Sequence, residues 1–258
     1  MKIKRISENK YTVYDDEGRR IGKCSVTRRE FSRIFTDAPV QFEISVSCTG
    51  ECRDLLYGAA VTRARVLAAA ENAPCRVYAD ITPTDKDALA VLTALGFINR
   101  DGIMRMYRPV TDERITQSVP RSCTIVRDFL DNEDELRRSL VRYNECFDAH
   151  NDVSWLREIA SQENFARILM VSPTELCGEL MVWTEGDTGV IGILQVARAW
   201  RRQGVASYLV EDARKYFSTL GLKRISFDVW LSAPGNLALA RKSGYKKGDM
   251  LALYPEIP

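Results

Sequence analysis

The strongest pattern of hydrophobic positions lies in the second half of the chain. Residues 190–197, VIGILQVA, are apolar at almost every position, which predicts a central strand buried on both faces. A loop, RAWRRQG, follows, and apolar residues then recur with the spacing of one helical face. The helix positions are Val205, Leu209, Ala213, Tyr216 and Leu220. Gly221 is expected to end this helix, because glycine readily adopts the left-handed conformation of a helix C-terminus.

Alternation and spacing predict the remaining elements of this half. Asn132 is expected to cap a helix that runs to about Phe147, because its side chain can accept from otherwise unbonded N–H groups. A second helix is expected at 154–165. The other predicted elements are strands at 124–129, 166–172, 177–184, 223–231 and 245–254, and a helix at 236–243.

The first half shows a similar order of elements. A hairpin is predicted in 10–26, KYTVYDDEGRRIGKCSV, where Asp-Glu-Gly forms the turn. The elements expected after it are a strand at 40–47, a helix at 53–71, a strand at 75–81, a helix at 85–95 and a strand at 97–107. Compared with the second half, this half is expected to lack the opening strand and two helices.

Two features recur at nearly the same distance along the chain. One is a glycine followed by an aromatic residue after a short helix, at Gly96-Phe97 and at Gly244-Tyr245. The other is a glycine in the loop before a long helix, at Gly50 and at Gly204. A repeat of this kind predicts two copies of one α/β (α+β) fold, each a mixed central sheet flanked by helices. The expected domains are a truncated copy at 1–110, a polar linker at 111–123 and a complete copy at 124–258.

Composition excludes several classes of protein. The chain has 258 residues, 45% hydrophobic and 28% charged, with a net charge of +2 and no long basic run, so no nucleic-acid partner is expected. No apolar stretch is long enough to span a membrane, and the start lacks a signal peptide, so a cytoplasmic location is expected. The seven cysteines form no CxxC pair and His150 is the single histidine, so no metal site and no histidine-activated nucleophile are expected.

The loop before residue 205 has the chemistry of an anion site. The first N–H groups of a helix have no partner within the helix and lie at the positive end of its dipole. Gly204 and Ala206 are small, so a phosphate could approach these groups closely, with Arg201, Arg202 and Gln203 around it. The prediction is a pyrophosphate site. The alternative is an ordinary glycine turn with exposed basic residues; a P-loop and a dinucleotide fingerprint are excluded by the spacing.

The segment from ILQVA through RAWRRQGVASYLV to SGY resembles the GNAT superfamily of acyl-CoA-dependent N-acyltransferases. Residues 201–206 match the family loop Arg/Gln-x-x-Gly-x-Gly/Ala. The resemblance covers 124–254 and, weakly, 10–108, as in a tandem GNAT protein. It implies acetyl-CoA as co-substrate, held by the strand and by the helix start. The residues assigned to it are Leu194, Gln195, Val196, Arg201, Arg202, Gln203, Gly204, Val205, Ala206, Ser207 and Asn236.

The expected proton chemistry departs from that family. Ala240 occupies the position of the tyrosine that usually protonates the coenzyme A thiolate, and Val190 that of a frequent catalytic glutamate. Ser232 and Tyr245 are the substitutes predicted here, with Tyr208 or water as alternatives, and a backbone N–H at Val196 is expected to stabilise the oxyanion. Four carboxylates remain as candidate bases: Glu179, Glu185, Asp187 and Asp228.

The loop of the first half lacks these features. Alignment of Gly50 with Gly204 places Ser47 at the position of Arg201 and Cys52 at that of Ala206. Glu51 and Asp54 would repel a pyrophosphate. The first half is therefore predicted to be a degenerate copy without bound coenzyme A.

The function expected from these observations is direct transfer of an acetyl or other short acyl group from acetyl-CoA to a primary amine by the C-terminal domain. The acceptor is a small molecule or a peptide, and a homodimer is among the assembly states left open. The alternatives are a non-catalytic acyl-CoA-binding or interaction module and a transferase with a larger acyl or aminoacyl donor.

Overall fold

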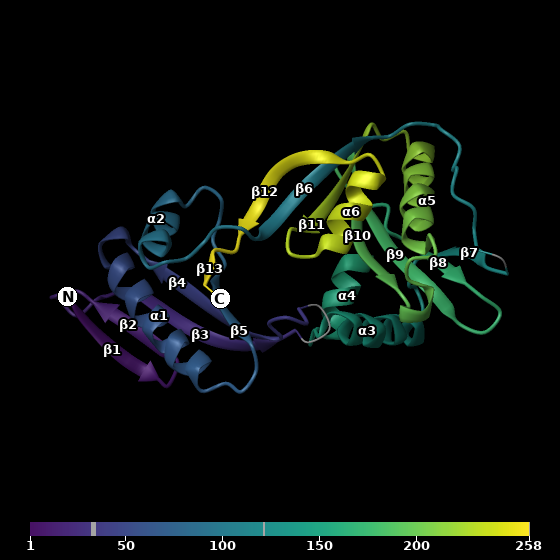
Figure 1. Cartoon of the computed structure of the whole chain (residues 1–258). Helices are drawn as coiled ribbons and strands as arrows, with labels where there is room; N and C mark the ends of the chain where they lie inside the picture. The colour runs from purple at the N-terminus through teal and green to yellow at the C-terminus, as the bar shows by residue number, and fades with distance from the viewer. Residues whose placement is uncertain (32–34, 121, 258) are drawn as a thin grey trace. The chain divides into compact units, whose positions relative to one another are not determined.

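The computed structural model describes residues 1–31, 35–120 and 122–257 and divides into two compact units (Figure 1). Unit 1 comprises Met1–Ile103 and Met250–Pro258, and unit 2 comprises Met104–Asp249. Each unit is a mixed β-sheet with helices packed against it, so the α/β fold class expected from the sequence is confirmed.

Unit 1 is built on a six-stranded sheet in the order β1-β2-β3-β4-β5-β13. The strands are β1 Lys2–Ser7, β2 Lys10–Tyr14, β3 Arg20–Glu30, β4 Val40–Cys48, β5 Cys75–Ala79 and β13 Glu256–Ile257. β4 and β5 are parallel, and the other pairs are antiparallel. The opening strand thought to be missing is present as β1, because Lys2–Ser7 pairs with β2 through a short turn.

The helices of unit 1 are α1 (Arg53–Ala69) and α2 (Lys86–Ala94), and the 3-10 turn η1 (Gly50–Cys52) leads into α1. Helical spacing brings Leu56, Ala60 and Ala64 to one face of α1, where they are fully buried against the sheet. Burial of this apolar face, rather than helix propensity alone, accounts for most of the stability of such a helix.

Unit 2 is built on a seven-stranded sheet in the order β12-β6-β11-β10-β9-β8-β7. The strands are β6 Gly102–Pro109, β7 Thr124–Asp128, β8 Ala166–Val171, β9 Leu176–Glu185, β10 Thr188–Val196, β11 Arg224–Trp230 and β12 Lys246–Leu253. Both β6 and β12 begin in one unit and end in the other.

Helices cover both faces of this sheet. They are α3 Glu133–Phe147, α4 Val153–Ala160, α5 Val205–Thr219 and α6 Pro234–Lys242, and the 3-10 turn η2 (Arg198–Trp200) precedes α5. α5 and α6 enclose one apolar core, and α3 and α4 enclose a second. Asn132 caps α3 as predicted, since its side chain accepts from the N–H groups of Asp134 and Glu135 at 2.9 and 3.2 Å. Among the described residues, none of the helices combines the length and the apolar character of a membrane span.

The repeated glycine-aromatic pair is a helix-ending motif. Gly244 has φ +82°, its N–H donates to the Arg241 carbonyl at 3.1 Å, and the N–H of Tyr245 donates to the Ala240 carbonyl at 3.0 Å. Gly96 and Phe97 make the same two bonds at the end of α2. This is the Schellman arrangement, in which the residue after the glycine packs into the core.

The division into units differs from the predicted domains at two places. β13 pairs with β5, so the last residues of the chain belong to unit 1. β6 lies between β11 and β12, and the segment predicted to be a free linker, 111–123, belongs to unit 2. Arg214 of α5, which is almost fully buried, donates to the carbonyls of Thr111 and Glu113 and holds that segment. Residue 121 of the segment and Pro258 lie outside the described residues.

Candidate active site in unit 2

β10 and β11 separate part-way along their length. Their parallel pairing runs from Thr188 with Arg224 to Ile191 with Phe227 and then stops. β10 continues to Val196 and β11 to Trp230. Beyond Ile191 and Phe227, no pairing joins the two strands within the residues that the structure describes, so β10 and β11 separate in the middle of the sheet.

The backbone groups of Leu194 and Val196 face this opening. β9 and β10 are antiparallel, and the Ala197 N–H donates to the Cys177 carbonyl at 3.0 Å. In an antiparallel pair, the residues that bond to the partner strand alternate with residues whose N–H and C=O groups point away from it. The alternation directs the N–H and C=O groups of Leu194 and Val196 away from β9, so both groups of Leu194 and the N–H of Val196 can bind an extended ligand.

Gly192 forms a bulge where the two strands separate. The register with β9 shifts between Ile191 and Ile193, which leaves Gly192 as the extra residue. A Cβ at this position would lie 1.9 Å from the Trp183 ring. The glycine is thus required because the indole ring lies directly against the backbone of the bulge.

The start of α5 presents a run of free backbone donors. None of the six N–H groups from Arg202 to Ser207 donates a hydrogen bond within the part of the chain that the structure describes; the first helical bond joins the Tyr208 N–H to the Gly204 carbonyl at 2.9 Å. Gly204 has φ +88° and Arg202 has φ +64°, so the loop turns through two left-handed residues. Such a run of N–H groups at a helix N-terminus is a site for phosphate.

Side chains of the loop brace it from within. Arg201 Nε donates to the Val196 carbonyl at 3.2 Å, and Gln203 Nε2 donates to the Ala199 carbonyl at 2.7 Å. These two side chains were expected to surround the anion, and each of them also holds the loop through one of these hydrogen bonds. Arg198 and Arg202 are exposed and make no ion pair with any described residue, so they are the cations available to a ligand.

α5 lies very close to β9 at Gly178. A Cβ there would come within 2.7 Å of Val205 Cγ1 and 3.1 Å of Leu209 Cδ1. The glycine therefore sets how near the helix start lies to the strands. The roles of Gly178 and Gly192 were not predicted from the sequence, although a glycine inside a strand is a signal for a bulge or a close backbone approach.

The structure corrects the role expected of Tyr245. This residue is 3% exposed, and its ring packs edge-on against Phe227 with 5.8 Å between centroids. Its hydroxyl is buried without a hydrogen-bond partner among the described residues, and burial raises the pKa of Tyr245 above its ordinary value. A phenol enclosed in the core cannot deliver a proton to a ligand in the opening, because it has no access to it.

The other residues assigned to the site differ in how exposed they are. Ser232 follows β11 in the turn to α6 and is half-buried, and Asn236 is exposed in the first turn of α6. Gln195 is 8% exposed, and its Nε2 lacks a partner within the described residues. Ala240 and Val190, which replace the usual tyrosine and glutamate, are both buried.

The candidate bases are mostly held by arginines. Asp228 forms two hydrogen bonds of 2.7 Å with Arg105, which also contacts Glu185 at 3.1 Å. The hydrogen bonds that Arg105 donates to Asp228 raise the pKa of Arg105 above its ordinary value. Glu179 is 1% exposed and accepts from Ser139 Oγ at 2.5 Å and Arg142 Nε at 3.2 Å. The carboxylates of Asp228 and Glu179 thus already accept hydrogen bonds from arginines.

The equivalent helix start in unit 1 is filled by protein. Cys52 is completely buried, and its thiol lies 3.6 Å from the Ile21 carbonyl and 3.7 Å from the Thr49 carbonyl. Gly50 lies in η1 and does not have a left-handed φ. Two acids, Glu51 and Asp54, occupy the first turns.

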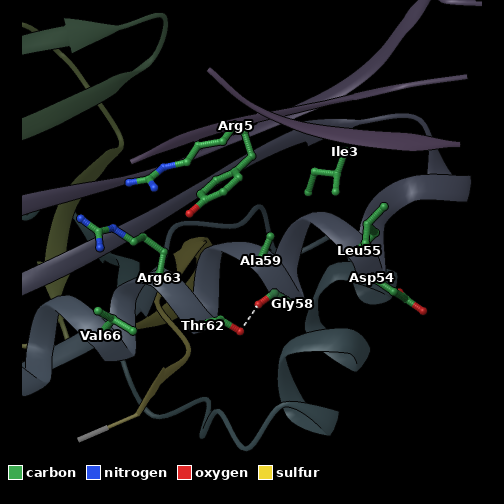
Figure 2. Close-up of a pocket in the computed structure, with 10 residues that line it drawn as sticks. Ile3, Arg5, Asp54, Leu55, Gly58, Ala59, Thr62, Arg63 and Val66 are labelled. Atoms are coloured by element: carbon green, nitrogen blue, oxygen red, sulfur yellow. Dashed lines mark hydrogen bonds between the residues drawn. The ribbon is translucent and has the colours of Figure 1, made fainter. Parts of the chain in front are cut away.

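A groove of about 570 Å³ runs along α1 in the same unit. Figure 2 shows its lining: Ile3, Arg5, Asp54, Leu55, Gly58, Ala59, Thr62, Arg63 and Val66. At the corresponding place in unit 2, between the edge strand β7 and α5, Arg127 bonds to Asp212 at 2.6 Å and lies over the Tyr216 ring. At the groove, α1 carries the small residues Gly58 and Ala59, and its Arg63 bonds instead to Glu8, in the turn after β1.

Comparison with known proteins agrees with this geometry. Residues 126–245 match the model of the acetyltransferase (GNAT) family. A GCN5-related N-acetyltransferase from Sphaerobacter thermophilus is similar in structure, with a TM-score of 0.57 and 17% identity, over 98% of this chain and 81% of that one. A Drosophila protein has a TM-score of 0.51 and 11% identity over 96% of this chain and 79% of its own.

A fungal multi-domain GH3 beta-N-acetylglucosaminidase has a GCN5-related glucosamine N-acetyltransferase region. Its structure matches with a TM-score of 0.53 and 14% identity, over 95% of this chain and 32% of that one. The comparison with curated proteins gave no match. The structural likenesses show the fold, and the family match places residues 126–245 among sequences of the GNAT family. The resemblance inferred from 124–254 is thereby confirmed.

Proposed function

We propose that unit 2 binds acetyl-CoA and transfers its acetyl group directly to a primary amine in a ternary complex. The observation that supports this most strongly is the run of six free N–H groups from Arg202 to Ser207, next to an opening between two strands. The pyrophosphate would bind these amides, with Arg198 and Arg202 adding positive charge. The backbone groups of Leu194 and Val196 would hold the pantetheine arm and the thioester.

The proposed mechanism depends on position rather than on a dedicated acid and base. Holding the amine and the thioester together removes much of the entropic cost of their encounter. The Val196 N–H would stabilise the negative charge that develops on the thioester oxygen. Its carbonyl is engaged by Arg201, which fixes the strand end. Because the nearby carboxylates are paired with arginines, the amine proton would leave through water.

The acceptor in this proposal is an amine on a small molecule or a peptide, and neither a nucleic acid nor a membrane is a partner. The protein would act in the cytoplasm, and a homodimer is one assembly state to test by its hydrodynamic size. A second function, non-catalytic binding of an acyl-CoA, is favoured by one specific observation. Ala240 and Val190 are apolar and buried, so the positions where the family usually has a tyrosine and a glutamate carry neither a proton donor nor a base.

A thermal-shift measurement with acetyl-CoA tests the binding step. A ligand at 100 times its dissociation constant stabilises the folded state by about 2.7 kcal/mol, so a clear rise in melting temperature is expected. Ala206→Glu should abolish the shift, because its carboxylate would repel the pyrophosphate. The same carboxylate should leave the free protein as stable as before, since acids are favourable in the first turn of a helix. Ala206→Gln is the neutral control of equal size and should retain part of the shift.

Turnover separates the two functions. Release of free coenzyme A in the presence of a panel of primary amines would support the transferase. A thermal shift without turnover on any amine would favour the binding module. The absence of a shift at millimolar acetyl-CoA would contradict both.

A further inference from the structure

Two thiols lie close together in unit 2 beside the proposed coenzyme A loop. The Sγ atoms of Cys123 and Cys177 are 3.7 Å apart, although the residues are distant in sequence. Cys177 is the second residue of β9 and is fully buried, whereas Cys123 precedes β7 and is half-buried. Both cysteines are reduced, and neither takes part in the proposed acetyl transfer.

Their surroundings favour redox chemistry over metal binding. Among the residues that the structure describes, no three His, Cys, Asp or Glu side chains come together as a metal site would require. Burial raises the pKa of Cys177 to about 11, so this thiol is protonated at neutral pH. The half-buried Cys123 is the thiol that a small reagent can reach first.

The pair joins two segments that frame the start of α5. On one side, the chain before β7 is held to α5 by Arg214, and Val110, Val119 and Cys123 pack against the core beneath that helix. On the other side, the Cys177 carbonyl accepts from the Ala197 N–H at 3.0 Å, where β10 leads into the loop. The next residue, Gly178, is the point of closest approach to Val205.

We propose that Cys123 and Cys177 are a redox modification site, which a low-molecular-weight disulfide converts into an intramolecular disulfide that weakens acetyl-CoA binding. The Cys123 thiolate attacks the small disulfide and releases one thiol. The Cys177 thiolate then attacks the Cys123 sulfur, and the second small thiol leaves and takes up the proton. Two protein thiols are oxidised, and one small disulfide is reduced to two thiols.

The expected loss of affinity follows from the geometry and rests on the proposed function. A disulfide bond is about 2.05 Å long, so the two sulfurs must approach each other by well over 1 Å. Formation of the bond would tie the segment before β7 to the start of β9. A single added carbon at Gly178 would already touch Val205 and Leu209, so a shift of β9 at this point would act on the start of α5 and on its amides.

The experiment treats the full-length protein with oxidised glutathione and digests it without reductant. The expected product is a linked pair of peptides containing Cys123 and Cys177, which dithiothreitol separates again. Cys123→Ser should give no such product. Cys48→Ser, which changes a half-buried thiol of unit 1, is the matched control and should give the same product as the unaltered chain.

Affinity for acetyl-CoA is then measured by titration of the reduced and the oxidised protein. We expect the dissociation constant to rise at least fivefold on oxidation and to recover after reduction, and we expect no change in Cys123→Ser. Absence of the linked peptides, or equal affinities of the two forms, would overturn the proposal. Failure of the reduced protein to bind acetyl-CoA would instead contradict the proposed function, and the peptide linkage would still decide whether the site exists.

Discussion

α5 and α1 follow equivalent strands of the two units, but they begin in different ways. At α5, the six N–H groups around the left-handed Gly204, from Arg202 to Ser207, have no acceptor among the described residues. At α1, the buried thiol of Cys52 fills the corresponding space, and Glu51 and Asp54 add negative charge. One helix start is arranged to receive an anion, and the other is sealed and repels one.

The packing behind the two helix starts is nevertheless the same. In unit 2, the first turn of α5 lies against Gly178 of β9, and in unit 1 the first turn of α1 lies against Gly22 of β3. The close approach of helix and strand is therefore a property of the shared architecture. The chemistry of the loop is a separate property, and one copy can lose it while its core remains intact.

The largest expected effect comes from filling these two contacts. Gly178→Ala would place a methyl group 2.7 Å from Val205 Cγ1, and Gly22→Ala would place one 2.7 Å from Cys48 Cβ. Overpacking of this kind costs about 1–3 kcal/mol, so both variants should unfold at lower urea concentration. The thermal shift with acetyl-CoA should disappear in Gly178→Ala and persist in Gly22→Ala.

The shift in the Gly22→Ala variant decides whether the two units differ in ligand binding. If this variant loses the acetyl-CoA response as completely as Gly178→Ala, the assignment of the ligand to unit 2 is wrong. If neither variant changes the free energy of unfolding, the contacts at Gly178 and Gly22 are not tight enough to exclude a methyl group.

The sequence predicted the local elements well because local patterns determine them. β10, α5 and the capped α3 lie within a residue or two of their expected positions, and Gly221 ends α5 with φ +72°. The prediction of an anion site rests on local sequence in the same way, since a glycine loop and the helix after it are contiguous in sequence. The repeat inferred from the sequence is present in the structure. Its glycine-aromatic pair ends a helix in each unit, and the aromatic residue packs into the core.

The features that escaped prediction depend on contacts between distant residues. An alternating pattern identifies β6 as a strand, but it does not show that its neighbours are β11 and β12. Nor does the sequence show that Arg105 donates hydrogen bonds to Asp228, or that Arg201 donates one to the Val196 carbonyl at the end of β10. These pairings determine what the Asp228 carboxylate and Arg201 Nε contact in the free protein. β1 was missed because residues 2–7, KIKRIS, are mostly polar.

A smaller effect should separate the two loop glycines themselves. Gly204→Ala forces a side chain into a left-handed residue at φ +88°, which costs about 1–2 kcal/mol. Gly50 lies in a 3-10 turn outside the left-handed region, and a Cβ there meets no atom within 4 Å, so Gly50→Ala should change the free energy of unfolding very little. Urea unfolding measures both values, and acetyl-CoA affinity should fall in Gly204→Ala alone. Equal costs at the two positions would contradict the difference drawn between the loops.

The smallest effect concerns Tyr245, whose counterpart in unit 1 is Phe97. Tyr245→Phe removes a buried hydroxyl that has no partner among the described residues, so the free energy of unfolding should rise by on the order of 1 kcal/mol. The difference should widen above pH 10: the unfolded tyrosine ionises near there, whereas burial raises the pKa of the folded one, so unfolding becomes easier only for the tyrosine form. Acetyl transfer, measured at neutral pH, should be unchanged. A hundredfold fall in turnover would show that the Tyr245 hydroxyl acts in catalysis and that Tyr245, unlike Phe97, is more than a core residue.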